Sequence, residues 1–351
     1  MTEVLTVDHR RLEELAASML AMQDVPEADA ERIAACLVLA DLRGLPSHGI
    51  ARLPVYAERL RRGLVKPRPN LNLDEPTPVC ARLDGDDGFG FVIATRAMDE
   101  AMERAQTYGI GMISAFRSTH FGMAACYLLQ AVEKGFAAFI FTNASPAMPV
   151  WGGREPFLGT SPFAFAAPGT DKVPSIVLDM ATSVVARGKI RRAAAKGEPI
   201  PEGWALDKEG NPTTDARAAY EGIVLPLAGP KGSGLSLMME VMGGVMSGAA
   251  FAGRVGNQYK DFDAPQNVGH TFVAIRPDVF VGQDYAARME ELVRRAKSST
   301  PIDAAQPVLM PGEPEALREA ENRRKGVEMP ADVAEALRQE ASRLGIRIDD
   351  F

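Results

Sequence analysis

Apolar residues in the first part of the chain recur at helical spacing. This spacing begins after Pro26, includes Ala30, Ile33, Ala34, Leu37 and Val38, and ends before Gly44, the expected stop of the helix. A second helical segment has its apolar positions at Leu53, Tyr56, Ala57 and Leu60 and ends at Gly63. Residues 66–78 contain four prolines and predict an extended linker. We therefore place a first domain boundary near residue 75.

The middle of the chain has a different pattern, in which short apolar runs alternate with helical ones. β-Branched and aromatic residues predict strands at 79–83, 110–116, 136–142, 163–167 and 175–178, with helices at 95–108 and 124–134 between them. Such alternation is typical of a mixed α/β domain. Residues 197–212, rich in Gly, Pro and charge, predict a long loop. Residues 232–248 are small and methionine-rich and predict a buried helix whose methionines fill the core.

The last hundred residues predict one strand, at 271–275, and three helices near 285–297, 314–325 and 331–343. Both ends of the chain are therefore helical in character, whereas the middle is not. This contrast indicates an α/β fold in which one domain is inserted into another. We expect a largely helical outer domain from residues 1–75 and 255–351, and an inner domain from residues 76–254.

Composition narrows the class of protein. The 351 residues are 46% apolar, and 39 basic against 46 acidic side chains give a net charge of −7, which disfavours nucleic acid as a partner. Neither an apolar leader nor a membrane span is apparent. Cys36, Cys80 and Cys126 form no disulfide framework and no paired metal motif, and only four histidines occur. We expect a cytoplasmic protein without metal and without membrane contact.

Several common nucleotide-binding and catalytic motifs are absent. The chain lacks the Rossmann fingerprint GxGxxG, because the glycines at residues 85–90 have the wrong spacing. The P-loop, the HExxH zinc motif and the GxSxG nucleophile elbow are absent as well. Any nucleotide site must therefore be built in another way.

The first candidate for chemistry is Ser47-His48-Gly49 followed by Arg52. In a helix starting at Ser47, His48 and Arg52 would share one face, although Pro54 favours a helix that starts nearer Leu53. A guanidinium can hold a carboxylate while an imidazole transfers a proton at the neighbouring carbonyl oxygen, which is what reduction of a 2-oxo acid requires. A simple helix cap with a solvated arginine is the alternative.

Three further segments have both a functional and a structural interpretation. His120 lies in a predicted strand-to-helix turn, where ligands commonly bind, but it also fits a helix cap or a satisfied buried histidine. Lys231 and Gly232 lie in a glycine-rich turn before an apolar helix, which suits a phosphate or an ordinary turn. Asp179 follows a predicted strand and either orients a histidine or caps the next helix.

Taken in order, these motifs resemble the malate/L-lactate dehydrogenase family of the second type, which also includes sulfolactate, ureidoglycolate and diketogulonate oxidoreductases and cyclic ketimine reductases. The resemblance covers most of the chain. It is carried by Ser47-His48-Gly49, Arg52-Leu53-Pro54, Ser118-Thr119-His120-Phe121-Gly122, Asn143-Ala144-Ser145-Pro146, Trp151-Gly152-Gly153, Leu158-Gly159-Thr160-Ser161-Pro162, Asp179-Met180-Ala181-Thr182-Ser183, Gly188-Lys189-Ile190, Gly229-Pro230-Lys231-Gly232-Ser233-Gly234, Asp263-Ala264-Pro265-Gln266-Asn267-Val268-Gly269-His270 and Pro311-Gly312-Glu313.

The resemblance implies a fold and a set of roles. The inner domain would be a non-Rossmann NAD(P)-binding domain with a mixed sheet, and homodimers with active sites near the interface would be expected. His48 would exchange the substrate proton, with Ser47 and Asp179 as its partners, Arg52 would anchor the carboxylate, and His120 would line the nicotinamide pocket or take the acid/base role itself. The residues expected to contact the cofactor are His120, Ile176, Asp179, Met180, Ala181, Thr182, Lys231, Gly232, Gly312 and Glu313.

These features lead to one main functional hypothesis, an NAD(P)-dependent oxidoreductase that interconverts a small 2-hydroxy acid and its 2-oxo acid. A reductase of cyclic ketimines is the alternative, because the same Arg–His pair can serve a C=N bond. A Ser-His-Asp hydrolase using Ser47 and a non-catalytic binding protein are weaker alternatives. The choice between NAD and NADP stays open, because Arg117, Arg187 and Lys189 can each meet a 2′-phosphate or remain solvated.

Overall fold

A seven-stranded mixed sheet lies at the centre of the computed structural model, which describes residues 4–348. In spatial order its strands are β2 (Asn72–Asp74), β3 (Cys80–Asp84), β4 (Ile110–Ser118), β10 (Val268–Ile275), β5 (Ala137–Thr142), β6 (Phe163–Ala167) and β7 (Ile176–Met180). Only β3 and β4 are parallel, and the other neighbours are antiparallel. The predicted mixed sheet is thus confirmed.

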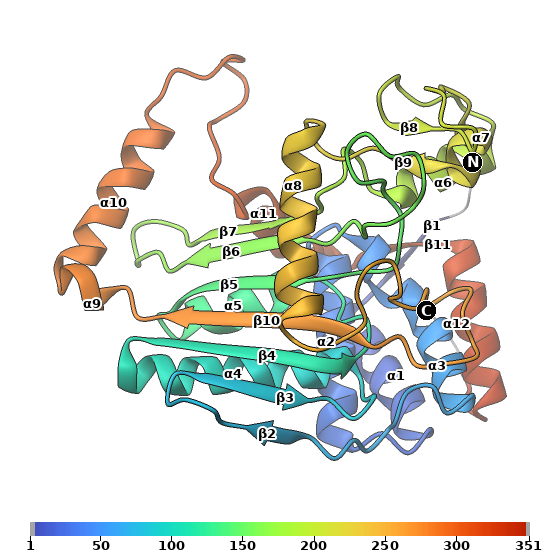
Figure 1. The fold of residues 1–351 in the computed structure, drawn as a ribbon, viewed down its shortest axis with the longest axis horizontal. Helices are drawn as coiled ribbons and strands as arrows, with labels where there is room; N and C mark the ends of the chain where they lie inside the picture. The colour runs from blue at the N-terminus through green and yellow to red at the C-terminus, as the bar shows by residue number, and fades with distance from the viewer. Residues whose placement is uncertain (1–3, 349–351) are drawn as a thin grey trace.

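Helices cover the two faces of this sheet unequally (Figure 1). Helices α4 (Gly90–Tyr108) and α5 (Ala125–Glu133) pack on one face, with α2 (Glu27–Leu42) beyond them. The other face is crossed by α8 (Pro230–Glu240) and a π-helical turn, η3 (Val241–Val245). Alternate residues of β4, such as Ile113 and Ala115, point into the well-covered side and are fully buried.

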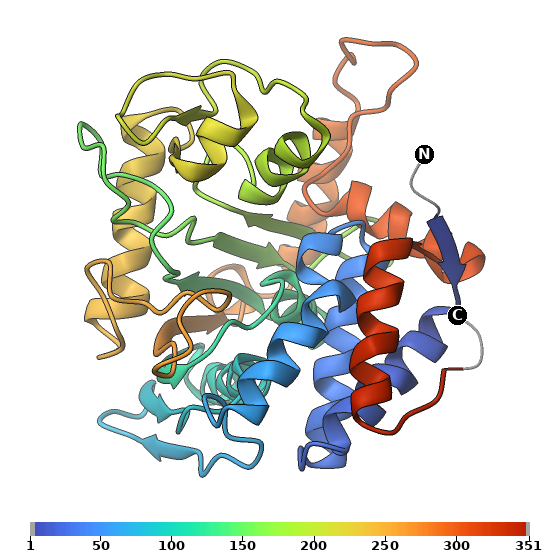
Figure 2. The same ribbon diagram turned by 90° about the vertical axis from the view of Figure 1, so that its right-hand side faces the viewer.

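The outer helices pack beside the sheet and share its hydrophobic core. Helices α1 (His9–Ala21), α2, α3 (Leu53–Arg61) and α12 (Ala331–Arg343) stand together in Figure 2, next to a two-stranded sheet of β1 (Val4–Val7) and β11 (Val327–Pro330). One continuous cluster of buried side chains joins these helices to the sheet, from Leu12 and Leu37 to Phe272 and Leu337. The sheet itself extends past both predicted cut points, because β2 begins at residue 72 and β10 ends at residue 275. The division into inner and outer domains stays a prediction.

A smaller unit with its own core lies above the sheet (Figure 1). It contains α6 (Arg187–Lys196), β8 (Ala205–Leu206), α7 (Ala216–Glu221) and β9 (Ile223–Val224), packed around Ile190 and Ala219. Most of residues 197–212 form a loop as predicted, but β8 interrupts it. The remaining elements are α9 (Asp278–Val281), α10 (Asp284–Lys297) and α11 (Glu313–Lys325).

The prediction of a buried helix at residues 232–248 whose methionines fill the core is only partly correct, because Met239 is fully buried whereas Met238 and Met246 are exposed. The face against the sheet is made of small and polar residues, because the backbones approach closely. A Cβ on Gly243 would lie 2.7 Å from the Asn143 amide nitrogen. Five large apolar residues on the outward side are 38–56% exposed: Leu237, Met238, Val241, Val245 and Met246. No helix among residues 4–348 is both long enough and apolar enough to cross a membrane.

Candidate active site

The Ser47–Arg52 segment forms two short turns before α3. The 3₁₀ turns η1 (Pro46–His48) and η2 (Ile50–Arg52) precede the α-helix, which starts at Leu53 with Pro54 in its first turn. A helix starting at Ser47 is therefore wrong, and the alternative start near Leu53 is confirmed. Proline is favoured in a first turn because its missing N–H would have no partner there.

Asp41, on α2, stabilises these two turns through its side-chain carboxylate. Its Oδ2 accepts a hydrogen bond of 2.7 Å from the Ile50 amide, and the carboxylate lies against Gly49. A Cβ at residue 49 would come within 2.1 Å of the Asp41 Oδ1, so glycine is required at this close approach. Burial raises the pKa of Asp41 to about 7. Asp41 was not predicted as part of the site, because its hydrogen bond to Ile50 spans nine residues and belongs to no motif.

Arg52 has hydrogen-bonding capacity that the protein leaves unused. Its Nε donates to the Ser47 carbonyl, and its guanidinium lies 5.7 Å from the centre of the Tyr259 ring. Its Nη1 is buried and has no hydrogen-bond partner within the described part of the chain. An unpaired buried cationic donor is costly, so this group is suited to an anionic ligand. The neighbouring Ser47 hydroxyl lies 2.9 Å from Nδ1 of His48.

The two predicted histidines are brought together. The His48 and His120 rings stack with their centroids 5.7 Å apart, and the Tyr56 hydroxyl lies 2.8 Å from Nδ1 of His120. The Gly122 amide donates to the same Nδ1 at 3.2 Å. Because an amide N–H can only donate, Nδ1 is an acceptor and the neutral His120 ring carries its hydrogen on Nε2.

Both imidazoles are held neutral at pH 7. Burial, together with the positive charge of Arg52, lowers the pKa of His48 to about 3. Burial lowers the pKa of His120 well below its ordinary value, with Arg52 and then His48 adding to the effect. Neutral rings can accept a proton at one nitrogen and donate one at the other.

A buried polar chain supports the turn that carries His120. His270, on β10, is fully buried, and its Nε2 lies 2.9 Å from the Ser118 hydroxyl while its Nδ1 lies 2.7 Å from the Thr142 hydroxyl. These contacts join β4, β10 and β5 just behind the turn. Gln266, at the entry to β10, accepts a hydrogen bond of 3.2 Å from the His120 amide. Neither Gln266 nor His270 was predicted as a site residue, although both lie in the segment 263–270 that contributes to the family resemblance.

A cleft of about 370 Å³ lies beside this site, between the end of β7 and the start of α11. Asp179 and Gly312, both predicted to contact the cofactor, line it, together with apolar side chains and the charged groups of Arg43 and Glu315. Oδ2 of Asp179 accepts a hydrogen bond of 2.8 Å from the Ala125 amide at the start of α5, and burial raises its pKa to about 6. No hydrogen bond joins Asp179 to a histidine among the described residues. Its predicted orienting role stays a prediction.

The other predicted cofactor residues connect to this cleft through the backbone. Thr182 accepts a hydrogen bond from the Leu227 amide, and the Leu227 carbonyl accepts one from Gly232 at the start of α8. Ile176, Met180 and Ala181 belong to this same segment, at and just after β7. Lys231 is exposed beside Gly232. The segment 176–182 thus joins the cleft to the glycine-rich turn.

Two charged residues considered for the cofactor have other partners. The Glu313 carboxylate forms an ion pair with Lys297 and accepts a hydrogen bond from the Met310 amide. Arg117 pairs with three carboxylates, Asp84, Asp86 and Asp87, which compete with any 2′-phosphate.

Comparison with known proteins supports the family resemblance. The model of the malate/L-lactate dehydrogenase family matches residues 7–338. The chain is 38% identical to an L-sulfolactate dehydrogenase of Methanocaldococcus jannaschii, over 96% of each chain. It is 33% identical to the NAD⁺-dependent ureidoglycolate dehydrogenase of Escherichia coli, over 96% of each, and 35% identical to an NADP⁺-dependent (2R)-3-sulfolactate dehydrogenase of Chromohalobacter salexigens, over 94% and 96%.

Solved structures are similar over nearly the whole chain. The sulfolactate dehydrogenase from Methanocaldococcus jannaschii matches with a TM-score of 0.93 and 35% identity, covering 99% of each chain. The Δ1-piperideine-2-carboxylate reductase of Pseudomonas syringae matches with a TM-score of 0.86 and 28% identity, covering 96% of this chain and all of that one.

Proposed function

Because the chain belongs to the malate/L-lactate dehydrogenase family, we propose that it interconverts a small 2-hydroxy acid and the matching 2-oxo acid at the Arg52–His48–His120 site. It is an NAD(P)-dependent dehydrogenase. The observation that carries the proposed substrate class is Arg52, whose buried Nη1 has no partner in the described structure and lies in a site with two neutral imidazoles.

Arg52 would bind the substrate carboxylate. Its Nε is already bonded to the Ser47 carbonyl, whereas its buried Nη1 has no partner within residues 4–348 and remains for the ligand. A guanidinium fork fits the two carboxylate oxygens and fixes the orientation of the adjacent carbon. The substrate carbon C2, which is bonded to the carboxylate, would then be held beside His48 and His120.

The two histidines would have different roles at the substrate C2 oxygen. His120 carries its hydrogen on Nε2, because Nδ1 accepts from Gly122, so it is suited to donate a hydrogen bond to that oxygen. The Ser47 hydroxyl can accept from Nδ1 of His48, which leaves Nε2 of His48 free to take the hydroxyl proton during oxidation. In reduction, His48 would return the proton.

The cleft beside the site fits part of a dinucleotide. Its apolar walls suit a flat base or ring, and the Asp179 and Glu315 carboxylates can accept hydrogen bonds from ribose hydroxyls. Gly312, with a φ of +87°, permits a turn that a side chain would strain. When bound, the nicotinamide supplies or accepts the hydride.

The test is the absorbance of NADH or NADPH in the presence of a panel of 2-hydroxy acids, 2-oxo acids and cyclic imines. We expect turnover with at least one hydroxy acid and loss of that turnover in Arg52→Ala. A panel with no turnover in either cofactor would refute the proposal. The ratio of rates with NAD and NADP would identify the preferred cofactor.

Reduction of a cyclic ketimine is the second candidate. It is supported by the 28% identical piperideine-2-carboxylate reductase and by the fact that such a substrate also has a carboxylate next to the reacting carbon. Arg52 can bind the carboxylate and the neutral histidines can exchange a proton whether the reacting bond is C=N or C=O. Faster reduction of a cyclic imine than of every 2-oxo acid in the panel would favour this candidate.

We propose a homodimer for this enzyme on the basis of its exposed apolar surface. The outward side of α8 and η3 exposes Leu237, Met238, Val241, Val245 and Met246, and Trp151 is 58% exposed beside the start of α8. A patch of this kind is typical of protein–protein contacts. A cytoplasmic location is part of the proposal, because all three cysteines are free.

A further inference from the structure

Three polar side chains follow one another along one side of α3. Arg52, at the end of η2 directly before the helix, is followed at intervals of four and three residues by Tyr56 and Arg59 on α3. Arg52 and Tyr56 belong to the site described above. Arg59 lies one turn further on, is only 1% exposed and has no assigned role.

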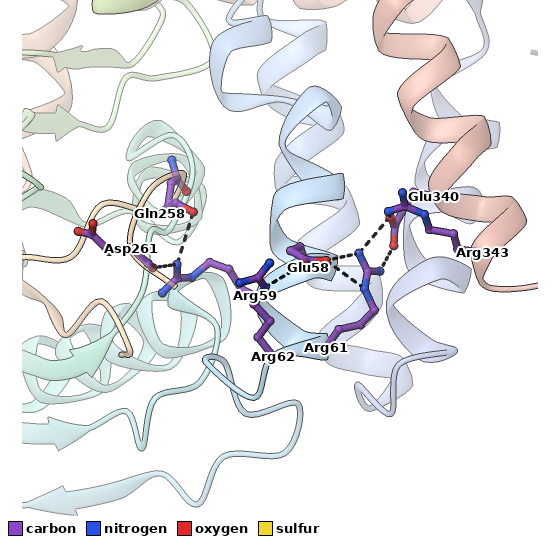
Figure 3. Close-up of polar contacts among 8 residues, drawn as sticks. All are labelled: Glu58, Arg59, Arg61, Arg62, Gln258, Asp261, Glu340 and Arg343. Atoms are coloured by element: carbon purple, nitrogen blue, oxygen red, sulfur yellow. Dashed lines mark hydrogen bonds and ion pairs between the residues drawn. The ribbon is translucent and has the colours of Figure 1, made fainter. Parts of the chain in front are cut away.

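The Arg59 guanidinium is bound by the main chain of one distant loop. Nη1 donates to the Asp261 carbonyl at 2.8 Å and to the Gln258 carbonyl at 3.4 Å, and Nη2 donates to the Ala264 carbonyl at 3.4 Å. Figure 3 shows the side chain reaching from α3 toward Gln258 and Asp261. No carboxylate forms an ion pair with Arg59 among residues 4–348. Because this buried cation donates to three main-chain carbonyls, it holds the backbone of the loop in place and does not serve to neutralise a carboxylate.

The same loop reaches the active site at two points. Tyr259 faces the guanidinium of Arg52, and Gln266 accepts from the amide of His120. The base of the loop is closed by the Gln266 side chain, which donates to the Gly256 carbonyl at 3.0 Å. The Asp261 side chain accepts a hydrogen bond from the Asn257 amide at 2.7 Å, so the outer part is a compact turn.

We propose that Arg59 is a positioning residue that holds loop 256–266 over the substrate site, so that Tyr259 lies against Arg52 and Gln266 against His120. This inference rests on the proposed function, because it takes the Arg52–His48–His120 site to be the substrate site. Arg59 reaches substrate only through the loop. Its loss should therefore loosen the wall beside the carboxylate anchor without altering the anchor itself.

Arg61 provides a matched control on the same helix. Figure 3 shows it pointing away from the loop, toward Glu340 on α12, and it also pairs with Glu58. Like Arg59, it makes several charge-assisted contacts between α3 and another element. Unlike Arg59, it has no contact with loop 256–266. Arg61→Gln should lower thermal stability while leaving substrate binding unchanged.

The experiment compares Arg59→Met, Arg59→Lys and Arg61→Gln in the full chain with two measurements. The first is limited trypsin digestion, which reports the mobility of the loop through cleavage after the exposed Lys260, relative to cleavage after the exposed Lys208 elsewhere. The second is the KM for the best hydroxy acid and for the dinucleotide. Arg59→Met removes all three hydrogen bonds to the loop. We therefore expect Lys260 cleavage and the hydroxy-acid KM to rise at least about tenfold, the change that the loss of one charge-assisted hydrogen bond alone would give. The dinucleotide KM should stay within about twofold.

Arg59→Lys keeps the charge but loses the fork, so intermediate values are expected in both measurements. If Arg59→Met does not fold, Arg59→Lys carries the test. An Arg59 variant with wild-type Lys260 cleavage, or with faster cleavage but an unchanged hydroxy-acid KM, would overturn the proposal. An equal rise in both constants, or the same response in Arg61→Gln, would also overturn it. If no substrate in the panel turns over, the proposed function fails, whereas the digestion still decides whether Arg59 holds the loop.

Discussion

Replacing Arg52 by lysine tests the carboxylate anchor most directly. Lysine keeps the positive charge but presents a single ammonium instead of a planar fork. The Nη1 of Arg52, unpaired in the described structure, and the adjacent Nη2 of the guanidinium can form two charge-assisted hydrogen bonds to a carboxylate, and the lysine would retain about one. A hydrogen bond to a charged group contributes about 1.5–3 kcal/mol, so kcat/KM should fall about 10- to 150-fold. Most of the loss should be in KM.

Steady-state kinetics with two substrates separates binding from indirect effects. Arg52 also donates to the Ser47 carbonyl, so its replacement can disturb the neighbouring His48. Comparison of a 2-oxo acid with its uncharged amide isolates the term that depends on the carboxylate. We expect Arg52→Lys to lower kcat/KM for the acid at least about tenfold more than for the amide. Equal losses on both substrates would refute the anchor role and leave Arg52 as a structural residue. Arg61→Lys on α3, where Arg61 pairs with Glu58 and Glu340 and points away from the site, is the control.

Three further predictions follow from the site. His48→Ala should lower kcat about 10²- to 10⁴-fold in stopped-flow or steady-state assays; near wild-type turnover together with an inactive His120→Ala would move the acid/base role to His120. Tyr56→Phe, which removes the hydroxyl from Nδ1 of His120, should reduce kcat more than the substrate KM, and a change in KM alone would contradict this. Burial lowers the pKa of His270 to about 3, so its neutral form stabilises the fold fully above about pH 6.5, and this stability is lost as the pH falls, by about 2 kcal/mol at pH 5. Urea unfolding of the wild type and of His270→Asn should show a shallower acid decrease in the variant; parallel curves would refute the assignment.

The central strands and main helices could be predicted because their patterns are local. The runs at 110–116, 136–142 and 163–167 have enough β-branched or aromatic residues to be recognised without their neighbours, and β4, β5 and β6 cover all of these residues except Phe136. Strands β1 and β11 were missed because each has only four residues and is stabilised by its partner more than three hundred residues away. β2 lies within the stretch predicted as a linker, since prolines on both sides obscure its three residues.

The site residues that could be predicted are those that lie close together in the sequence or in a recognisable turn. Ser47, His48 and Arg52 occur together in sequence, and His120 lies in a recognisable turn. Tyr259 and Gln266 were not identified because their relation to Arg52 and His120 depends on a loop that lies far along the chain, with Gln266 146 residues beyond His120. Nothing in the composition of residues 256–266 shows which buried side chain holds them.

Tyr56 shows why helical periodicity alone cannot separate core from site. It was grouped with Leu53, Ala57 and Leu60 as an apolar position of α3, and its burial agrees with that interpretation. Its ring does pack against Phe91, but its hydroxyl bonds His120. The apolar residues of α3 therefore fix the rotation of the helix, and that rotation aims Arg52, Tyr56 and Arg59 at the substrate anchor, the histidine and the loop. A substitution that rotates α3 should disturb all three contacts together, whereas changes at Arg52, Tyr56 or Arg59 should disturb them one at a time.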